Sequence, residues 1–474
     1  MLNIGSRLEV FWDDYMVDTE KTTATKCLHS PVRRECVFHF DKPWEGDGCD
    51  YQNILYDDGL YRMYYLGWSM ISSDRKKHTT DQIRVCYLES RDGLHWERPN
   101  LGLYEYDGSR DNNILLAGDY GTFDNFMVMK DKNPTCPPEE RYKAIGICSG
   151  YKPGLQCFIS PDGIHFKRGW TVTEKGYFDS LNTVLWDETR EMYIAYIRGF
   201  HEKEGCADQW GVRDIRYITS KDFRNWTDPV MLDYGEGDDY PLYTNVISRY
   251  PRAPHLFTGF PTRYVERQGW NDSFEQLCGK EQRQMRMKIH PRYGLAITDC
   301  VFMSSRDGFH WNRFEEAFMR PGPEAPDNWL YGDCYPSLGM IETPGTYPGT
   351  DNELSMYLPA GHWMGEDTRF YRYTIRMDGF VSRNATYKPQ KLVTKPFIYD
   401  GNELHINFET SARGNLYIKL ICEDGRSIET DEIFGNRTDR KIGFINGSPA
   451  DFAGKPVTME ITMSDADIYS FRFC

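Results

Sequence analysis

The sequence lacks the patterns that mark nucleic-acid-binding and membrane-spanning proteins. Lys and Arg form no basic run, and the formal net charge is −15 with a pI near 5.3, whereas a nucleic-acid binder presents a basic face. No window approaches the roughly 20 apolar residues that a membrane helix needs. We therefore expect neither nucleic acid nor a membrane as a partner. The acidic balance also fits poorly with an anionic polysaccharide, unless a local basic pocket overrides the average.

Signals for cofactors, metals and secretion are also missing. The sequence contains no Gly-rich phosphate loop, HExxH, GxSxG or nucleotide fingerprint. Its 13 cysteines form no CxxC pair, so neither a zinc site nor a disulfide framework is indicated. Free thiols at this density favour a reducing compartment, and residues 1–18 do not resemble a signal peptide. We expect a cytoplasmic protein without a cofactor, or a secreted one if a leader was removed. A calcium ion on a central axis stays an open alternative that no ligand spacing indicates.

Aromatic residues are abundant and helix-period patterning is scarce. Phe, Trp and Tyr make up 15% of the chain, with 12 Trp and 32 Tyr. Aromatic side chains favour strands and pack β cores, and their flat rings also stack on sugars. The only helical signal that we note is EEAF at residues 315–318, which predicts at most one turn. The composition favours an all-β protein.

A short pattern recurs five times and reveals internal repeats. The copies are SRDGLHW (90–96), SPDGIHF (160–166), SKDFRNW (220–226), SRDGFHW (305–311) and the degenerate RMDGFVS (376–382). In such a pattern Asp bonds to the backbone that follows it, Gly supplies a positive φ, and the aromatic residue re-enters the sheet. Each copy follows an apolar or alternating run, and a strand–turn–strand pattern precedes each of them. We assign the repeat to the construction of β hairpins.

Five repeats of about four strands predict a five-bladed β-propeller over residues 1–390. We expect the opening segment, 8–18, to complete the last blade and close the ring. From residue 391 the character changes to alternating strands separated by Gly, Asp and Asn turns. The predicted fold is therefore all-β, a five-bladed β-propeller followed by a small C-terminal β-sandwich at 391–474.

Several phrases of the sequence resemble a known group of proteins. They include DKPWEG (41–46), YRMYYLGW (61–68), DGLHWERPNLGLYEYDGSRDNNI (92–114), FDSLN (178–182), GFPTRY (259–264), RPGPE (320–324) and DGFVSRNA (378–385). They resemble a bacterial group labelled glycoside hydrolase family 32-like, and TSARGNLYIKL and DADIYSFRF near the C-terminus share that resemblance. Family 32 proteins combine a five-bladed propeller with a sandwich, and family 43 propellers are similar. The resemblance implies a glycosidase.

The characteristic family 32 motifs are absent. These are Asn-Asp-Pro-Asn in the first blade, Arg-Asp-Pro in the second and Glu-Cys in the third, so the resemblance does not extend to fructans as substrates. The similarity to family 43 implies a positional rule instead, with one acidic residue at the start of the innermost strand of blades one to three. The predicted starts of the five inner strands carry Asp50, Asp124, Asp179, Thr244 and Asp333.

Glycosidic cleavage requires two carboxyl groups, one protonated and one ionised. Inner strands converge at one end of a propeller, and crowded carboxylates raise the pKa of at least one member. We predict Asp50 as the base or nucleophile, with Asp47 and Glu45 as alternatives. Asp124 would orient the sugar and tune its neighbours, and the resemblance implies Asp179 as the acid. Each of these acids could instead cap a turn or a strand end.

Further residues are candidates for holding the sugar. An arginine can clamp a hydroxyl or a carboxylate, and aromatic rings can stack on a sugar face. The predicted substrate-binding residues are Trp44, Trp68, Arg198, Trp210, Arg263, Asp333 and His362.

The sequence therefore predicts a glycoside hydrolase with a carbohydrate substrate. Two alternatives stay open. A glycoside phosphorylase would need a phosphate pocket, for which Arg198, Arg252, His255 and Arg263 are available. A non-catalytic carbohydrate-binding propeller would keep the acids without turnover. The sugar, the stereochemical outcome and the oligomeric state are left open by the sequence.

Overall fold

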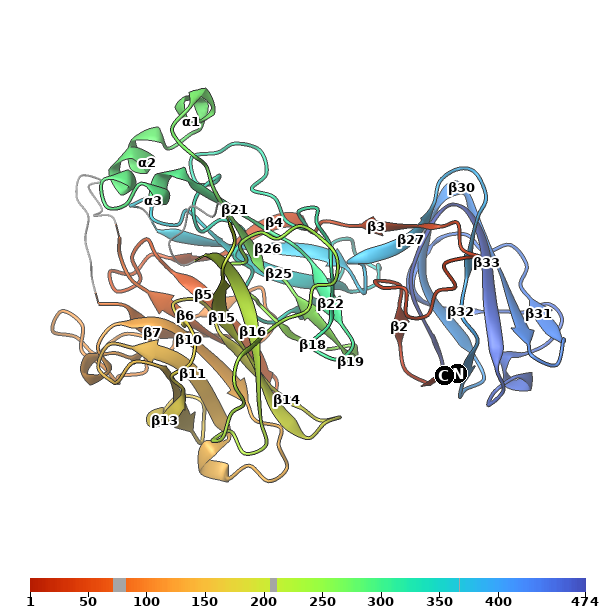
Figure 1. Ribbon diagram of the computed structural model, residues 1–474, viewed down its shortest axis with the longest axis horizontal. Coiled ribbons are helices and arrows are strands. Elements are labelled where there is room, and N and C mark those ends of the chain that lie inside the picture. Colours follow the sequence, from red (N-terminus) through yellow and green to blue (C-terminus); the bar gives the residue numbers. More distant parts are fainter. Residues whose placement is uncertain (71–81, 205–210, 366) are drawn as a thin grey trace.

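The computed structural model describes residues 1–70, 82–204, 211–365 and 367–474 and consists mostly of β-strands. Figure 1 shows a larger region, coloured red-brown to cyan, beside a smaller blue one. The larger region is a five-bladed propeller and the smaller one a sandwich, which confirms the predicted fold class. Within the described ranges, no helix is long and apolar enough to cross a membrane.

The five blades are separate antiparallel sheets. Blade one contains β5 (Asp50–Asp57), β6 (Leu60–Gly67), β7 (Arg84–Ser90) and β8 (Trp96–Glu97), with β9 (Ile114–Leu116) beside β7. Blade two contains β10 (Phe123–Lys130), β11 (Tyr142–Cys148), β12 (Leu155–Ser160) and β13 (Lys167–Thr173). Blade three contains β14 (Thr183–Asp187), β15 (Met192–His201), β16 (Val212–Ser220) and β17 (Val230–Met231). Blade four contains β18 (Ser248–Tyr250), β19 (Ala253–Gly259), β22 (Met303–Ser305) and β23 (Trp311–Arg313).

Blade five closes the ring with a strand from near the N-terminus. Its strands are β24 (Ile341–Thr343), β25 (Glu353–Ala360), β26 (Thr368–Arg376) and β4 (Val32–Phe40). The expectation that residues 8–18 would do this is wrong, because β2 (Glu9–Val10) pairs with a strand of the sandwich instead. Most of β4 is only partly buried and rich in charged residues, as suits a strand at the edge of a sheet.

Three copies of the recurring Ser-x-Asp-Gly turn connect neighbouring blades. In the first copy, the Asp92 carboxylate accepts hydrogen bonds from the backbone amides of Leu94 and His95, at 2.8 Å each. Gly93 has a φ of 74°, and its carbonyl accepts a hydrogen bond from the Tyr357 hydroxyl of blade five. Tyr64 and Tyr196 make the same contact with the next blade at Gly163 and Gly308. The assignment of this repeat to blade construction is confirmed.

Blade four carries an insertion that the sequence analysis missed. The hairpin β20 (Thr262–Glu266) and β21 (Ala296–Cys300) carries three short helices at its tip. These are α1 (Asp272–Gln276), α2 (Lys280–Met287) and α3 (Arg292–Leu295), at the top of Figure 1. Residues 315–318 form no helix. Short 3-10 turns occur at Gly118–Tyr120, Pro138–Glu140 and Pro449–Asp451.

The sandwich is one ten-stranded sheet wrapped around a core of its own. Its strands are β1 (Leu2–Gly5), β2, β3 (Thr25–Leu28), β27 (Val381–Ala385), β28 (Gln390–Val393), β29 (Phe397–Tyr399), β30 (Leu404–Cys422), β31 (Ser427–Glu429), β32 (Asn436–Ile442) and β33 (Val457–Phe473). Because β1 to β3 and β27 belong to this sheet, we propose that the sandwich comprises residues 1–28 and 381–474.

The junction between the two regions is built from buried charged and aromatic side chains. Trp12 packs against Tyr250, Phe302 and Phe380 of the propeller core. The neighbouring Phe11 belongs to the core of the sandwich instead. Residues 8–18 therefore contribute large apolar side chains to two cores, which explains these side chains without a place in a blade.

Asp378, in the degenerate fifth copy of the repeat, also lies in this junction. It is fully buried, and its carboxylate accepts hydrogen bonds from the hydroxyls of Tyr250 and Ser470. The degenerate copy therefore holds the sandwich against blade four.

Candidate active site

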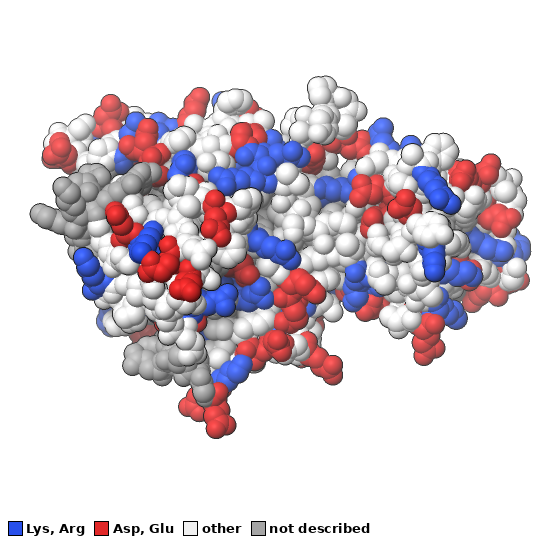
Figure 2. All heavy atoms as spheres, turned by 90° about the horizontal axis from the view of Figure 1, so that it is seen from above, with Lys and Arg blue, Asp and Glu red and all other residues white. Residues whose placement is uncertain are grey.

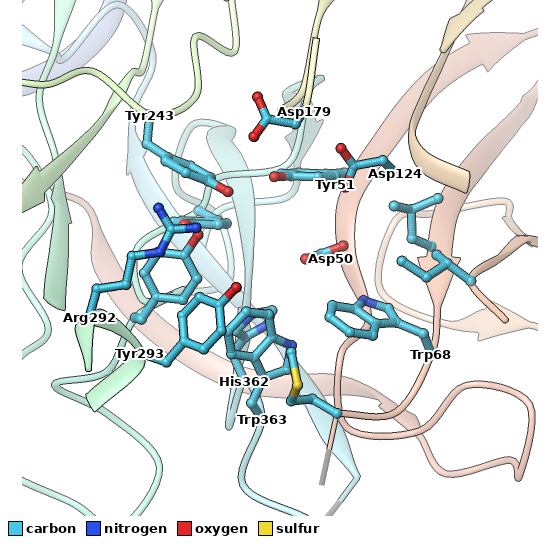
Figure 3. Close-up of a pocket in the computed structure, with 15 residues that line it drawn as sticks. Asp50, Tyr51, Trp68, Asp124, Asp179, Tyr243, Arg292, Tyr293, His362 and Trp363 are labelled. Atoms are coloured by element: carbon cyan, nitrogen blue, oxygen red, sulfur yellow. The ribbon is translucent and has the colours of Figure 1, made fainter. Parts of the chain in front are cut away.

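A small pocket of about 170 Å³ lies where the inner strands of the first three blades begin. Asp50 is the first residue of β5, Asp124 the second residue of β10, and Asp179 precedes β14 by four residues. Figure 3 shows these three side chains around one cavity. The structure therefore brings together three of the acids predicted from strand starts, from three different blades.

Asp50 lies at the buried part of the pocket. The register of β5 against β6 shifts between Asp50 and Asn53, and Tyr51 between them has a φ of 53°. Asp50 is 5% exposed, and its Oδ1 atom has no hydrogen-bond partner within the described residues. Burial, together with the nearby Asp124, raises the pKa of Asp50 well above its usual range, because both disfavour the charged form. Asp50 therefore holds its proton more tightly than an ordinary aspartate does.

Asp124 interacts electrostatically with both other acids, because its charge acts on Asp50 and the charge of Asp179 acts on it. Burial first, and then the charge of Asp179, raise the pKa of Asp124 to about 6, while Arg198 opposes the shift. Asp124 therefore changes its charge close to neutral pH, where a small change in its surroundings moves a proton on or off.

Asp179 lies at the exposed side of the pocket. Its side chain is 62% exposed, and its Oδ1 atom accepts a hydrogen bond of 2.6 Å from Nη1 of the buried Arg198. Arg198 in turn lies over the ring of Tyr243, 4.4 Å from its centroid. A charge-assisted hydrogen bond of this kind stabilises the ionised carboxylate. The pocket thus holds a buried acid whose pKa is raised and an exposed acid that is paired with an arginine.

Aromatic side chains form the rest of the wall. Trp68 meets Trp363 edge to face with ring centroids 5.4 Å apart, and Tyr243 stacks on Tyr335 at 5.6 Å. Tyr331 and Tyr293 complete the lining. Such walls offer flat apolar faces together with polar tips.

Several polar atoms of this wall have no partner. The hydroxyl of Tyr335, Nδ1 of His362 and Nε1 of Trp363 are buried, and no described residue bonds to them. Buried polar atoms in native proteins are normally paired with protein or water. Burial, followed by the charge of Arg286, lowers the pKa of His362 to about 3, so its ring is neutral. These atoms are placed to bind a ligand that carries several hydroxyl groups.

The insertion of blade four supports this wall. Arg286 of α2 is fully buried and donates hydrogen bonds to the carbonyls of His362 and Trp363, at 3.2 and 3.1 Å. Burial and the neighbouring Arg283 lower the pKa of Arg286 to about 9. The next helix, α3, supplies Arg292 and Tyr293 to the lining.

Some predicted residues have structural roles outside the pocket lining. Asp47 accepts hydrogen bonds from the amides of Met70 and Gly365 and so holds two loops beside the pocket. Glu45 is fully buried and binds Arg98 and the Tyr65 hydroxyl. Trp44 donates to Asn113. None of these three lines the cavity, because their polar atoms face the interior of blade one and its loops.

Of the other predicted residues, some line the pocket and others have structural roles outside it. Trp68 and His362 line the pocket, and Arg198 lies behind it. Arg263 forms a two-bond ion pair with Asp299. Asp333 accepts a hydrogen bond from Leu330, and burial raises its pKa to about 7, but it does not line the cavity. Trp210 lies outside the described residues.

The arginines and the histidine considered for a phosphate pocket do not meet. Arg252 lies 3.4 Å from Asp378, and His255 lies 3.5 Å from Glu9, both at the junction with the sandwich. In the described part of the chain, no three His, Cys, Asp or Glu side chains are grouped so as to hold a metal ion.

Sequence reasoning missed most of the aromatic wall and its arginine. Tyr51, Tyr243, Arg292, Tyr293, Tyr331, Tyr335 and Trp363 line the pocket. Tyr243 directly precedes Thr244 at the start of an inner strand, so the rule that located the acids could also have found it. Arg292 and Tyr293 come from an insertion with no counterpart in the other blades, and no repeat could have indicated them.

No protein-family model and no curated protein matches this chain. Among solved structures, it is similar to an N-acetylgalactosamine deacetylase from F. plautii in complex with blood group B trisaccharide, with 15% identity, coverage of 75% of this chain and 96% of the other, and a TM-score of 0.43. It is similar to a family 43 arabinoxylan arabinofuranohydrolase from Bacillus subtilis, with 12% identity, coverage of 91% and 96%, and a TM-score of 0.42. It is also similar to the Bombyx mori family 32 β-fructofuranosidase BmSUC1, with 10% identity, coverage of 94% of each chain and a TM-score of 0.41. The two glycoside hydrolase families that the sequence phrases resemble are thus both among the similar structures.

Proposed function

We propose that this protein is a glycoside hydrolase that cleaves a glycosidic bond with the carboxyl groups of Asp50, Asp124 and Asp179. The observation that carries the proposal is the convergence of these acids, from three blades, in one aromatic pocket where Asp50 is buried and Asp179 is exposed beside Arg198. Hydrolysis of a glycoside needs one carboxyl group that gives a proton and another that accepts one or attacks carbon.

The charges of the free pocket favour a particular division of labour. Burial raises the pKa of Asp50 and favours its protonated form, so it can protonate the oxygen of the leaving group. Asp179 is exposed and bonded to Arg198, so it can deprotonate a water molecule or attack the anomeric carbon. Asp124 adjusts the charge between them. This is the reverse of the assignment from strand positions and from the family resemblance, in which Asp50 is the base or nucleophile and Asp179 the acid.

The pocket also supports a carbohydrate as the substrate. The rings of Trp68, Trp363 and Tyr243 offer apolar faces on which a sugar ring can stack, and unpartnered polar atoms lie beside them. The small volume suits one sugar unit bound in the cavity with the remainder of the substrate outside.

A glycan and aryl-glycoside panel tests this function. The purified chain is incubated with neutral and acidic oligosaccharides and with 4-nitrophenyl glycosides, each with and without inorganic phosphate. We expect release of a reducing sugar that does not depend on phosphate. Formation of a sugar 1-phosphate would identify a phosphorylase instead, and binding without turnover across the panel would identify a carbohydrate-binding propeller.

A further inference from the structure

Arg292 differs from the other arginines near the pocket because it faces the cavity without an acidic partner. Arg198 is paired with Asp179, and Arg263 with Asp299, each through a contact of 2.6 Å. Among the residues that the structure describes, no carboxylate forms an ion pair with Arg292, and its Nε atom is buried without a hydrogen-bond partner. An arginine keeps its charge in proteins. The pocket therefore contains a cation whose counter-charge is not supplied by the described chain.

The surroundings hold the Arg292 side chain in place. Its guanidinium carbon lies 5.2 Å from the centroid of the Tyr293 ring. In Figure 3 the side chain extends toward Tyr243, on the side of the pocket away from Asp124. A guanidinium group supported by aromatic rings loses little freedom when it binds a ligand, and its planar edge matches a carboxylate or a sulfate.

Other guanidinium groups add positive charge on the same side. Arg198 and Arg213 lie 4.4 and 5.9 Å from the centroid of the Tyr243 ring. Arg213 also lies 4.6 Å from the centroid of the Tyr264 ring. The side of the pocket around Tyr243 therefore holds Arg292 and the ion pair of Arg198 with Asp179, whereas Asp50 and Asp124 lie on the other side. Arg292 on that side favours a ligand that places its anionic group there and its neutral part toward Asp50 and Asp124.

We propose that Arg292 selects a substrate whose sugar carries an anionic carboxylate or sulfate group. This inference rests on the proposed glycosidase function and specifies the class of its substrate. The anionic group would bind Arg292, and this orientation keeps it away from the carboxyl groups that act on the glycosidic bond. Uronic acids and sulfated sugars present the same chemistry to a guanidinium group.

The acidic balance of the whole chain is compatible with this selection. Acidic and basic side chains are interspersed over both regions on the face shown in Figure 2, so the net charge of −15 is not concentrated around a single site there. A local cation inside a pocket of low dielectric outweighs distant surface charges, which salt screens within about 10 Å. The substrate would be an oligosaccharide with one anionic sugar in the pocket rather than a long polyanion on the surface.

Matched sugars test the role of Arg292 by calorimetric titration. Each series contains a neutral sugar, its uronic acid and its 6-sulfate, for galactose, glucose and mannose. We expect at least one charged sugar to bind about tenfold more tightly than its neutral counterpart, a difference of about 1.4 kcal/mol. The carboxylate and sulfate arms distinguish the two anions. Arg292→Gln should bring the charged and neutral sugars within about twofold of each other.

Two further variants complete the design. Lys288→Gln removes the same charge from an exposed residue of the same insertion, outside the pocket lining, and should keep the full preference. Arg292→Lys keeps the charge but not the planar fork, so a reduced preference should remain. If Arg292→Gln fails to fold, a full tenfold preference in Arg292→Lys would overturn the proposal, because the fork would then be dispensable.

The outcomes separate this inference from the proposed function. Equal binding of neutral and charged sugars by the unmodified protein would overturn the role of Arg292 and leave the glycosidase proposal intact. An unchanged preference in Arg292→Gln would do the same. Failure of every sugar to bind, together with no turnover in the glycan panel, would overturn both.

Discussion

Buried acids occur both in the pocket and at the junction with the sandwich, and their pKa values are shifted in opposite directions in the two regions. In the pocket, no cation of the described residues forms an ion pair with Asp50, and its pKa is raised. At the junction, Glu9 is equally buried but lies 3.0 Å from Arg306 and 2.6 Å from Arg7. Burial alone would raise the pKa of Glu9, but the nearby His255 and the charge of Arg306 lower it to about 2.

The difference separates a functional arrangement from a structural one. A buried acid that is paired with cations can hold two parts of a protein together, and removing a partner is costly. A buried acid without a cation reduces stability, and such groups cluster at sites of catalysis. The absence of an ion pair with a described cation, rather than burial itself, distinguishes Asp50 from Glu9.

The largest expected effect is on turnover. Asp50→Asn and Asp179→Asn should each lower kcat by about 10²–10⁴-fold, the usual contribution of a positioned acid or base, with unchanged circular dichroism spectra. Glu9→Gln, at the junction, should leave kcat unchanged. Near-normal activity in both pocket variants would break the comparison.

The same variants determine which acid gives the proton. A 4-nitrophenolate leaving group needs little protonation, so the variant that lacks the acid keeps more activity on an aryl glycoside than on an oligosaccharide. We expect this behaviour from Asp50→Asn. Its appearance in Asp179→Asn would restore the assignment made from strand positions.

The next largest effect concerns stability. Arg306→Ala leaves Glu9 and Asp13 buried without the cation that bonds to both, which should lower the free energy of unfolding by about 3 kcal/mol. Urea denaturation followed by tryptophan fluorescence measures the change. Lys288→Ala, at an exposed position, should change it by less than about 0.5 kcal/mol. Equal stability of the two variants would show that the junction does not depend on this pairing.

The pH dependence of stability should have opposite signs in the two regions. The pKa of Asp124 is about 6 in the folded protein, above its unfolded value, so Asp124 reduces stability as the pH rises from about 4 to 6. Asp124→Asn should therefore stabilise the protein at pH 7 by roughly 1–3 kcal/mol and have little effect at pH 4.

Glu9 should behave in the opposite way. Its folded pKa of about 2 lies below the unfolded value, so its contribution is present above about pH 4.5 and is lost as the pH falls through 2. Glu9→Gln should cost about 3 kcal/mol at pH 7 and much less near pH 2. Thermal denaturation of both variants across this range tests the signs, and parallel curves for Asp124→Asn and Glu9→Gln would refute the distinction.

The smallest effect compares two tyrosine hydroxyls. The hydroxyl of Tyr250 bonds to Asp378 at the junction, so Tyr250→Phe should cost about 1–2 kcal/mol. The hydroxyl of Tyr335 has no partner in the described residues, so Tyr335→Phe should leave stability within about 0.5 kcal/mol and weaken sugar binding instead. Equal melting temperatures would contradict the contrast.

The repeated turns and the strand starts made the propeller and three of its acids predictable. The loop WEGDGCD offers Glu45, Asp47 and Asp50, and composition alone does not rank them. Which of the three acids lines the cavity depends on the backbone at Tyr51, where the register of β5 against β6 shifts and Asp50 lies in the cavity. Asp47 and Glu45 are bonded to loops and strands instead. A local conformation of this kind is decided by packing, which the repeat pattern does not contain.

Ring closure could not be predicted for a related reason. The strand β4 lies at an edge and is mostly exposed or partly buried, whereas Phe11 and Trp12 of residues 8–18 fill two cores. Neither segment carries a sequence signal for its partner, and the hydrogen bonding assigns β4 to the blade and β2 to the sandwich. The insertion that carries Arg292 was missed because it belongs to one blade only.

The pairing of β4 with β26, and of β2 with β33, has a consequence for how the chain acquires its structure. The strands β2 and β4 are synthesised early, but the strands with which they pair leave the ribosome much later. Until then, four blades can form in succession while β4 lacks the sheet that it joins and the apolar side chains of residues 8–18 stay uncovered. Contacts between distant parts of a sequence slow folding and prolong the exposure of sticky surfaces. Production of this protein should therefore depend on chaperones that shield the N-terminal stretch until synthesis ends.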